Sequence, residues 1–411
     1  MTSSQTLRAI PVDDRAWLIA ALGDALQGGA PVLPVGPGID EQAVDKLRAA
    51  ELPAGTAVVV RTSGSSGVPK AVALSAASLL ASAEATHAVF GGPGQWLITL
   101  PGHLISGLQM LVRSAAAGID PVFCDEAGDP GALLAAAETM DHDRRYVSVV
   151  PVQLERLLDL AETDEDAADT LRRFDTVLVG GQALSLDLRT RAYNLGVKIR
   201  RSYGMTETSG GCVYDGVEIG DTGVRIRQGE VQLSGSCLAL GYIGDAELTD
   251  DRFIEEVNRS GELVRWYRTG DAGELLGGML TVTGRIDRVL ISGGINVSLD
   301  EVERVVREHS GWGSAVALST GAIGVPANEW GDRPVLVVEA PAGTDREDFE
   351  AIRASVHSAL GPAAVPEWAV GIAAMPRLAG GKPNLRAIAE WLADQDLTAL
   401  ENLDSNSGDA R

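Results

Sequence analysis

Cysteine and long apolar runs are scarce in this sequence, and each shortage excludes a class of protein. The 411 residues include only three cysteines, Cys124, Cys212 and Cys237, which are far apart. Their spacing suggests neither a zinc site nor a disulfide framework, so we expect buried free thiols. No apolar run is long enough for a membrane helix, and residues 1–17 lack the pattern of a signal peptide. We therefore expect a cytoplasmic protein without stable membrane insertion.

Positive charge is also in short supply. The chain carries 34 Lys and Arg against 57 Asp and Glu, a formal net charge of -23. General binding of nucleic acid needs a basic face, so this composition argues against it. Small anionic ligands remain compatible, because a cleft can supply local positive charge and backbone amides. The expected partners are therefore small molecules and no nucleic acid.

The order of the apolar segments predicts an α/β fold. Strand-like runs at 56–60, 71–74, 95–100, 146–150 and 176–179 alternate with helix-like segments, such as Ser75 to Ala88 and the segment 105–117 closed by Gly118. This alternation predicts a large N-terminal domain of parallel or mixed sheets covered by helices. Hairpin patterns predict a β-rich subdomain at about 222–284.

The last third of the chain has a different pattern of predicted helices and strands. Ser298 with Glu301, and Thr344 with Glu347, are capping-box patterns that each open a helix. Strand-like runs lie between these helices, so we expect a small α+β domain. The resulting division is an N-terminal domain at 1–286, a C-terminal domain at 287–395 and a polar tail at 396–411.

A loop rich in serine and glycine, "TSGSSGVPK" at 62–70, follows the first strand-like run. It offers hydroxyl groups, unobstructed backbone N–H groups and one mobile cation, which are the parts of a phosphate cradle. A flexible surface linker is the alternative on composition alone. The loop lacks the Walker and the common serine-hydrolase patterns. Its candidate ligand-binding residues are Thr62, Ser63, Gly64, Ser65, Ser66, Gly67 and Lys70.

Four further motifs follow in a definite order: "SYGMTE" at 202–207, "YRTGD" at 267–271, "GRID" at 284–287 and "AGGKPNLR" at 379–386. In this combination the chain resembles the acyl-adenylate-forming superfamily of acyl-CoA synthetases, luciferases and adenylation domains, from about residue 56 to 392. The resemblance implies a mobile C-terminal domain with a hinge at Asp287. It also implies that a carboxylate and ATP give acyl-AMP, from which a thiol such as that of CoA displaces AMP.

The resemblance assigns roles to particular residues. Glu207 would bind Mg²⁺, a hard cation that prefers carboxylate and phosphate oxygens. Asp271 would accept hydrogen bonds from the ribose with Arg285 beside it, and Lys382 would neutralise charge as two anions meet. Singly, these three could be a helix-start carboxylate, a turn residue and a solvated lysine. The other implied residues are Thr206 in catalysis and Gly180, Gly181, Gln182, Tyr203 and Gly204 in nucleotide binding.

Two stretches of the sequence narrow the choice of acid substrate. "LPGHLISGLQMLVRSAAAG" and "SYGMTETSGGCVYDG" resemble the o-succinylbenzoate-CoA ligases of menaquinone biosynthesis. That substrate has two carboxylates, and the resemblance places Arg113 against the aromatic one; a surface arginine is the alternative. His103 departs from the family register, so it is either a substrate contact or a core histidine. The remaining substrate-binding candidates are Ser106, Gly107 and Ser209.

Several functions stay open at this point. The leading one is an AMP-forming ligase that makes o-succinylbenzoyl-CoA from o-succinylbenzoate, ATP and CoA with Mg²⁺. Another aryl or short acyl acid, or a carrier protein as acceptor, is the alternative within the same chemistry. A nucleotide-binding pseudoenzyme is the alternative outside it, and the sequence does not settle whether the chain forms a homodimer.

Overall fold

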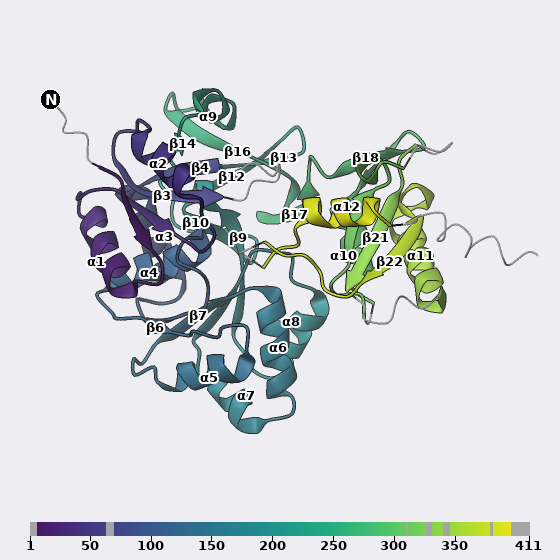
Figure 1. Ribbon diagram of the computed structural model, residues 1–411, viewed down its shortest axis with the longest axis horizontal. Helices are drawn as coiled ribbons and strands as arrows, with labels where there is room; N and C mark the ends of the chain where they lie inside the picture. Colours follow the sequence, from purple (N-terminus) through teal and green to yellow (C-terminus); the bar gives the residue numbers. More distant parts are fainter. Residues whose placement is uncertain are drawn as a thin grey trace, which may run out of the picture. The chain divides into compact units, whose positions relative to one another are not determined.

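The structure is a computed structural model that describes residues 6–62, 70–309, 311–325, 331–339, 346–378 and 381–395. The chain divides into two compact units. Unit 1 is Met1–Thr269 with Gly273–Thr281, and unit 2 is Gly270–Ala272 with Val282–Arg411. Figure 1 shows an α/β architecture with mixed sheets, as the sequence predicts.

The first sheet of unit 1 carries the predicted phosphate loop. Its strands lie in the order β1 (Arg8–Pro11), β2 (Val32–Val35), β3 (Thr56–Thr62), β4 (Lys70–Ser75) and β14 (Gly241–Tyr242). β3 and β4 are antiparallel and pair Thr62 with Lys70, so both ends of the loop are fixed by the sheet. The nearby helices are α1 (Arg15–Leu26), α2 (Glu41–Ala49), α3 (Ala76–Val89) and α4 (Ile105–Ala117).

Both predicted helices of this region are confirmed, and their ends have clear causes. The Ser75 hydroxyl caps α3 by accepting the Ser78 N–H at 3.0 Å. Gly118 ends α4 with φ 65°, a left-handed conformation that glycine adopts without a steric penalty.

The second sheet is mixed and mostly parallel. Its order is β11 (Val217–Glu218), β10 (Gly210–Tyr214), β9 (Ile199–Met205), β8 (Thr176–Val179), β7 (Arg145–Val149), β5 (Gln95–Ile98) and β6 (Val122–Phe123). Trp96 and Ile98 pack on the side of α3 and α4, whereas Leu97 packs in the opposite core. The helices of that opposite core lie together in Figure 1: α5 (Pro130–Glu138), α6 (Pro151–Ala161), α7 (Glu165–Arg172) and α8 (Leu186–Asn194).

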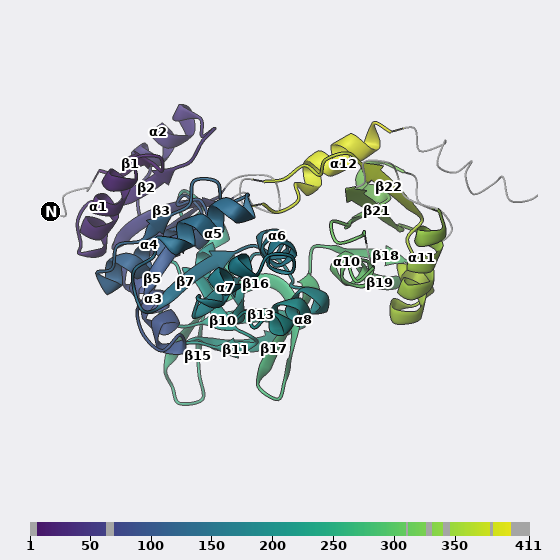
Figure 2. The same ribbon diagram turned by 90° about the horizontal axis from the view of Figure 1, so that it is seen from below.

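A third sheet confirms the predicted β-rich segment. Its strands are β12 (Gly223–Arg227), β13 (Glu230–Ser234), β16 (Leu263–Leu276) and β15 (Phe253–Val257), with β17 (Met279–Arg285) paired to β16. Helix α9 (Ala246–Arg252) precedes β15. Figure 2 shows the β15–β16 and β16–β17 connections as two projecting hairpins. Gly277 and Gly278 turn the second hairpin with φ 59° and 80°, values that suit a tight hairpin turn.

Unit 2 is the expected α+β arrangement. Strands β20 (Val316–Ser319), β21 (Pro334–Glu339) and β22 (Trp368–Ile372) form its main sheet, and β18 (Val289–Ser292) pairs with β19 (Ile295–Ser298). Helices α10 (Leu299–Val306) and α11 (Arg346–Leu360) share one core with the sheet, and α12 (Leu385–Ala393) shares the other. Ser298 caps α10 as predicted, whereas Thr344 lies outside the described residues.

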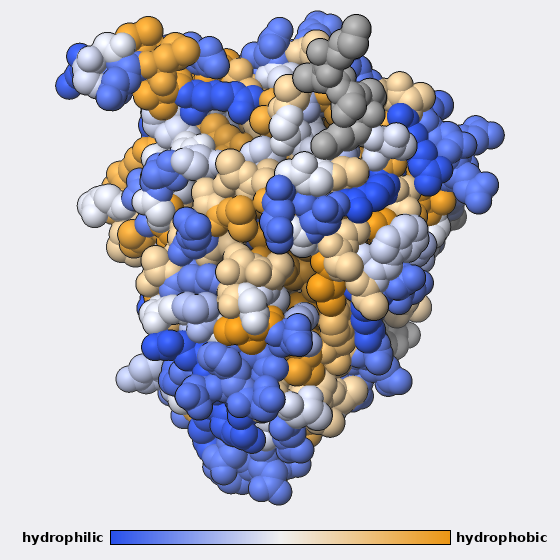
Figure 3. Space-filling view, turned by 90° about the vertical axis from the view of Figure 1, so that its left-hand side faces the viewer, coloured by the Kyte–Doolittle hydropathy of each residue, from blue (hydrophilic) through white to orange (hydrophobic). Residues whose placement is uncertain are grey.

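The surface, the helix lengths and the cysteines bear on the expectations drawn from composition. Figure 3 shows one face of the protein, on which hydrophilic and hydrophobic residues are interspersed. Across the described residues, no helix is long and apolar enough to cross a membrane. Cys212 and Cys237 are buried free thiols as predicted; Cys124 is only half-buried, because its side chain lies at the edge of the second core.

Candidate active site

Four parallel strands of the second sheet gather the predicted site segments of unit 1. Strands β5, β7, β8 and β9 are parallel, so their carboxyl ends lie along one edge of the sheet. Beyond that edge come Pro101 to His103, Pro151, Gly180 to Gln182, and Thr206 with Glu207. Ligands of α/β sheets characteristically bind outside this edge.

The ends of the serine- and glycine-rich loop lie on the first sheet. Thr62 ends β3 and Lys70 begins β4, while Ser63, Gly64, Ser65, Ser66 and Gly67 lie outside the described residues. The Lys70 ammonium lies 5.6 Å from the centroid of the Tyr242 ring. The cationic end of the loop is thus held near Tyr242 by a cation–π contact.

Tyr242 connects this loop to the Glu207 carboxylate. Glu207 is only 8% exposed, and its Oε1 accepts a hydrogen bond from the Tyr242 hydroxyl at 2.8 Å. Burial, and then the negative charge of Glu207, raise the pKa of Tyr242 and of Tyr267. Both phenols therefore stay protonated at neutral pH, and the Tyr242 hydroxyl holds one oxygen of Glu207 in place by its hydrogen bond.

The short helix η1 (Thr206–Thr208) fixes the backbone around Glu207. The Thr208 hydroxyl donates to the Gly210 carbonyl at 2.7 Å and accepts the Met205 N–H at 2.9 Å. From the other side, the Ala239 N–H donates to the Glu207 carbonyl at 2.8 Å. Thr206 is 7% exposed, so the turn is buried and supported from two segments of the chain.

Close backbone contacts explain the glycines next to this turn. A Cβ on Gly204 would lie 2.1 Å from the Gly210 carbonyl oxygen, which leaves room for glycine alone. Ser209 adopts φ 52°, which is uncommon for a residue other than glycine. Its hydroxyl is buried and has no hydrogen-bond partner among the described residues.

The predicted adenine-binding segment follows β8. Gly181 is exposed and has φ 86°, and a Cβ on Gly180 would meet Ser202 at an ordinary 3.5 Å. Gln182 and Tyr203 are half-buried. Since Val179 pairs with Arg201, the segment that follows β8 and Tyr203 on β9 belong to neighbouring strands of the sheet.

Helix α4 carries a line of polar residues on one face. Ser106, Gln109 and Arg113 are spaced by three and four residues, so they lie on the same face over two turns. Ser106 is exposed and Arg113 is 2% exposed, so the face runs from solvent into the core. Gln109 donates to the Ser209 carbonyl at 2.6 Å, while its own Oε1 is buried without a partner among the described residues.

Arg113 is buried without a carboxylate. Its guanidinium lies 4.9 Å from the centroid of the Trp96 ring and donates to the Tyr214 hydroxyl at 3.3 Å. No ion pair with an acidic side chain of the described chain accompanies these contacts, and Nε has no partner there. The alternative of a surface arginine is therefore wrong, because α4 packs its polar face against β5 and β10.

The buried charge of Arg113 affects the pKa of His87 on α3. Desolvation, and then the charge of Arg113, lower the pKa of His87 from 6.5 to about 4, and its Nε2 is buried without a partner in the described residues. The imidazole is thus neutral at physiological pH. His87 Nε2 and Gln109 Oε1 are thus both buried without a hydrogen-bond partner among the described residues. Buried polar atoms of this kind call for a ligand or bound water.

The structure places His103 and Gly107 in packed positions. A Cβ on Gly36 would lie 2.5 Å from His103 Nδ1, so the imidazole rests on that glycine, and burial lowers its pKa. Gly36 directly follows β2, which pairs in parallel with β3 through Val32 and Val58. A Cβ on Gly107 would lie 2.2 Å from the Pro101 carbonyl oxygen, which gives this glycine a packing role.

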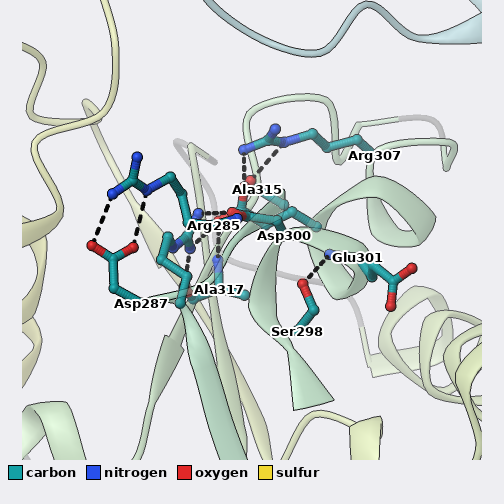
Figure 4. A network of polar contacts seen from close by, with 10 residues as sticks. Arg285, Asp287, Ser298, Asp300, Glu301, Arg307, Ala315 and Ala317 are labelled. Carbon is teal, nitrogen blue, oxygen red and sulfur yellow. Dashed lines mark hydrogen bonds and ion pairs between the residues drawn. The ribbon is translucent and has the colours of Figure 1, made fainter. Parts of the chain in front are cut away.

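Unit 2 brings together the remaining motif residues. Arg285 on β17 forms an ion pair with Asp271 at 3.0 Å and a two-point pair with Asp287 at 3.0 and 3.1 Å. Figure 4 shows the Asp287 pair and the neighbouring network, in which Asp300 accepts the Arg285 backbone N–H at 2.6 Å. These contacts raise the pKa of Arg285, so its guanidinium is a fixed cation between Asp271 and Asp287.

Lys382 lies in a tight hairpin of unit 2. The Leu378 N–H donates to the Lys382 carbonyl at 2.8 Å, and Asn384 then caps α12. Desolvation lowers the pKa of Lys382, the Asp271 charge raises it and the Arg285 charge lowers it. The residue as a whole is exposed, whereas its lowered pKa reflects a desolvated ammonium group near Asp271 and Arg285. The sequence motifs of Asp271, Arg285 and Lys382 thus meet in one neighbourhood.

Two residues of the site were missed by the sequence reasoning. Gln109 could have been found, because it is a polar residue at helical spacing from both Ser106 and Arg113. Tyr242 carried no such signal, because its contact with Glu207 joins segments 35 residues apart.

The Glu207 environment fits a magnesium ion that is shared with phosphates. Within the described residues no group of three or more metal-ligating side chains exists. Mg²⁺ needs none, since it commonly uses one or two carboxylates together with substrate phosphates and water. Glu207 has one oxygen bonded to Tyr242 and a second one without a hydrogen bond to another described residue. That second oxygen is the one that could bind the ion.

The fold, the glycine-rich edge and the buried carboxylate are those of an adenylate-forming enzyme. Residues 31–236 match the family of AMP-binding enzymes, and the chain belongs to this family. Over 389 residues it is 36% identical to the probable 2-succinylbenzoate–CoA ligase of Mycobacterium tuberculosis strain CDC 1551 / Oshkosh, covering 92% of this chain and 96% of that protein.

Solved structures give a consistent comparison. A variant of E. coli MenE with bound OSB-AMS superposes with a TM-score of 0.67 at 25% identity, covering 90% of this chain and 83% of that one. The o-succinylbenzoate CoA synthetase (MenE) of Bacillus subtilis in complex with the acyl-adenylate intermediate OSB-AMP superposes with a TM-score of 0.72 at 21% identity, covering 95% and 88%. The second likeness concerns the fold alone.

Proposed function

We propose that this chain is an ATP- and Mg²⁺-dependent acid–thiol ligase that converts 2-succinylbenzoate and CoA to 2-succinylbenzoyl-CoA, in menaquinone biosynthesis. The succinyl carboxylate attacks the α-phosphorus of ATP, and pyrophosphate leaves. The CoA thiol then attacks the acyl carbon, and AMP leaves. Neither step needs a nucleophile from the protein, so catalysis is positioning and electrostatic stabilisation.

The observation that carries the substrate assignment is the unpaired Arg113. A buried cation without a carboxylate is costly, and its desolvation is offset when a ligand supplies the missing charge. The aromatic carboxylate of 2-succinylbenzoate supplies it, at the inner end of the polar face of α4. Ser106 and Gln109 lie on the same face, and Ser209 is joined to Gln109 through its carbonyl; these residues offer hydrogen bonds to the rest of the acid.

The nucleotide occupies the carboxyl edge of the sheets in this proposal. The loop from Thr62 to Lys70 binds the β- and γ-phosphates, and Gly180, Gly181, Gln182, Tyr203 and Gly204 form the adenine pocket. Glu207 would hold Mg²⁺, which neutralises phosphate charge when it is bound. Thr206 supports this segment and contacts phosphate.

The C-terminal domain supplies the other charged groups. Asp271 accepts hydrogen bonds from the ribose, and Arg285 fixes the carboxylate through the ion pair described above. Lys382 contacts the α-phosphate and the reacting carboxylate in the adenylating state. The domain from 287 to 395 turns at Asp287 between the two half-reactions. We place the reaction in the cytoplasm and leave a homodimer as a prediction.

Acid-dependent exchange of labelled pyrophosphate into ATP tests the adenylation half of the proposal. We expect exchange with 2-succinylbenzoate and none with benzoate, succinate or acetate, because only the first acid has both carboxylates at the required separation. Exchange that is fastest with one of the other acids would keep the adenylating activity and overturn the substrate.

A further inference from the structure

Cys212 and Cys237 meet in one small core although they are far apart in the sequence. Cys212 lies on β10 and Cys237 follows β13, and their exposed fractions are 1% and 4%. Both belong to the same buried cluster, together with Val231 and Leu233. Both are free thiols. The fold thus places the two thiols in the same small core although no disulfide joins them.

A hydroxyl group lies beside one of the thiols: the Thr222 hydroxyl oxygen is 3.9 Å from the Cys237 sulfur. The neighbouring Cys212 thiol, and then Thr222, lower the pKa of Cys237 against the effect of burial. The same thiol pair and burial raise the pKa of Cys212. Cys237 is therefore the better thiolate, and the thiolate is the form that reacts with oxidants.

We propose that Cys237 and Cys212 form a reversible redox-modification site, in which a peroxide oxidises Cys237 and Cys212 resolves the product to a disulfide. In the first step the Cys237 thiolate attacks a peroxide oxygen; an S–O bond forms, the O–O bond breaks and, with one proton, water leaves. In the second step the Cys212 sulfur attacks the sulfenic sulfur; an S–S bond forms, the S–O bond breaks and a second water leaves. The two thiols give up two electrons and the peroxide is reduced.

The disulfide would act on the Glu207 turn from both sides. Cys212 lies on β10, which begins two residues after η1, and Cys237 is two residues from Ala239, whose N–H donates to the Glu207 carbonyl. A disulfide has an S–S distance of about 2.0 Å, shorter than any hydrogen-bonded sulfur contact, so both segments must move. Shifts of this size at supporting residues slow catalysis. This consequence rests on the proposed function, whereas disulfide formation does not.

Intact-mass measurement after treatment with hydrogen peroxide tests the modification itself. A Cys124→Ser background removes the half-buried thiol and leaves the pair. We expect this protein to lose the mass of two hydrogen atoms and to regain it with dithiothreitol. In the same background Cys212→Ala should instead gain oxygen on Cys237. Gain of oxygen without loss of hydrogen while both cysteines are present, or an unchanged mass under peroxide that oxidises Cys124 in the natural chain, would overturn the proposal.

The same samples give the functional readout. We expect oxidation to lower the 2-succinylbenzoate-dependent pyrophosphate exchange several-fold, with recovery after reduction, and the Cys212→Ala protein to show no reversible loss. An unchanged exchange rate in fully disulfide-bonded protein would refute the link to Glu207. Absence of exchange in the reduced protein would refute the proposed function, while the mass result would still decide the modification.

Discussion

Replacing Arg113 by methionine should separate binding of the acid from stability of the fold. Methionine keeps most of the apolar volume of the side chain and removes its charge. Truncating one partner of a buried charge pair typically costs about 2–5 kcal/mol, which corresponds to a rise of roughly 30-fold or more in KM for 2-succinylbenzoate. The KM for ATP should change little, because the nucleotide does not contact this residue in our account.

The free energy of unfolding should not fall when Arg113 is replaced, although binding of the acid should weaken. Removal of Arg113 forfeits the contact with Trp96, about 2 kcal/mol, and a hydrogen bond to Tyr214 of about 1 kcal/mol. It also removes the desolvation penalty of an unpaired buried cation, which is several kcal/mol. Urea unfolding of the unliganded protein should therefore show a free energy of unfolding that is unchanged or higher.

A surface arginine provides the matched control. Arg191 on α8 pairs with Asp159 at 2.6 Å and Glu162 at 2.7 Å, and its side chain is 21% exposed, against 2% for Arg113. Arg191→Met should lower the free energy of unfolding by no more than about 1 kcal/mol and leave both KM values unchanged. An unchanged KM for 2-succinylbenzoate in Arg113→Met would refute the reasoning. An equal rise in the KM of Arg113→Met for an analogue that lacks the aromatic carboxylate would also refute it. The lost interaction would then be packing against the acid and no ion pair with its carboxylate.

Three further predictions follow from the charges and contacts of single residues. Lys382→Ala should abolish acid-dependent exchange of pyrophosphate while calorimetry still detects ATP binding; equal turnover would remove the role given to this lysine. His87 has a folded pKa of about 4 against 6.5 when unfolded, so the unfolded state binds the extra proton between these values and stability falls as pH drops from 6.5 to 4. The loss should reach up to roughly 3 kcal/mol, and His87→Gln should abolish it in pH-dependent urea unfolding, whereas the exposed His357→Gln should not. Tyr242→Phe removes the hydrogen bond to the Glu207 carboxylate and should lower the free energy of unfolding by roughly 1.5–3 kcal/mol in the same assay, and no loss would mean that the bond is not formed in solution.

Local patterns were enough to predict much of the fold. The Ser75 cap, the Gly118 end of α4 and the strands on both sides of the loop depend on neighbouring residues, and the sequence predicts all of them. The order of such elements also predicts the mixed sheets. The family resemblance is confirmed by the match to AMP-binding enzymes.

The contacts that matter most for the site are long-range, and the sequence could not show them. Whether Arg113 faces solvent or the core depends on how α4 packs on β5 and β10, so both alternatives stood until the structure placed it. The bond from Tyr242 to Glu207 and the meeting of Cys212 with Cys237 likewise depend on strand order. The positions of Ser63 to Gly67 lie outside the described residues, so the phosphate cradle remains a prediction.

Mass spectrometry of the complete reaction tests the central claim most directly. The purified protein would be incubated with ATP, Mg²⁺, CoA and 2-succinylbenzoate, with benzoate, succinate and acetate in parallel. The account predicts AMP and a CoA thioester from 2-succinylbenzoate alone. A thioester of another acid, or ADP in place of AMP, would contradict it.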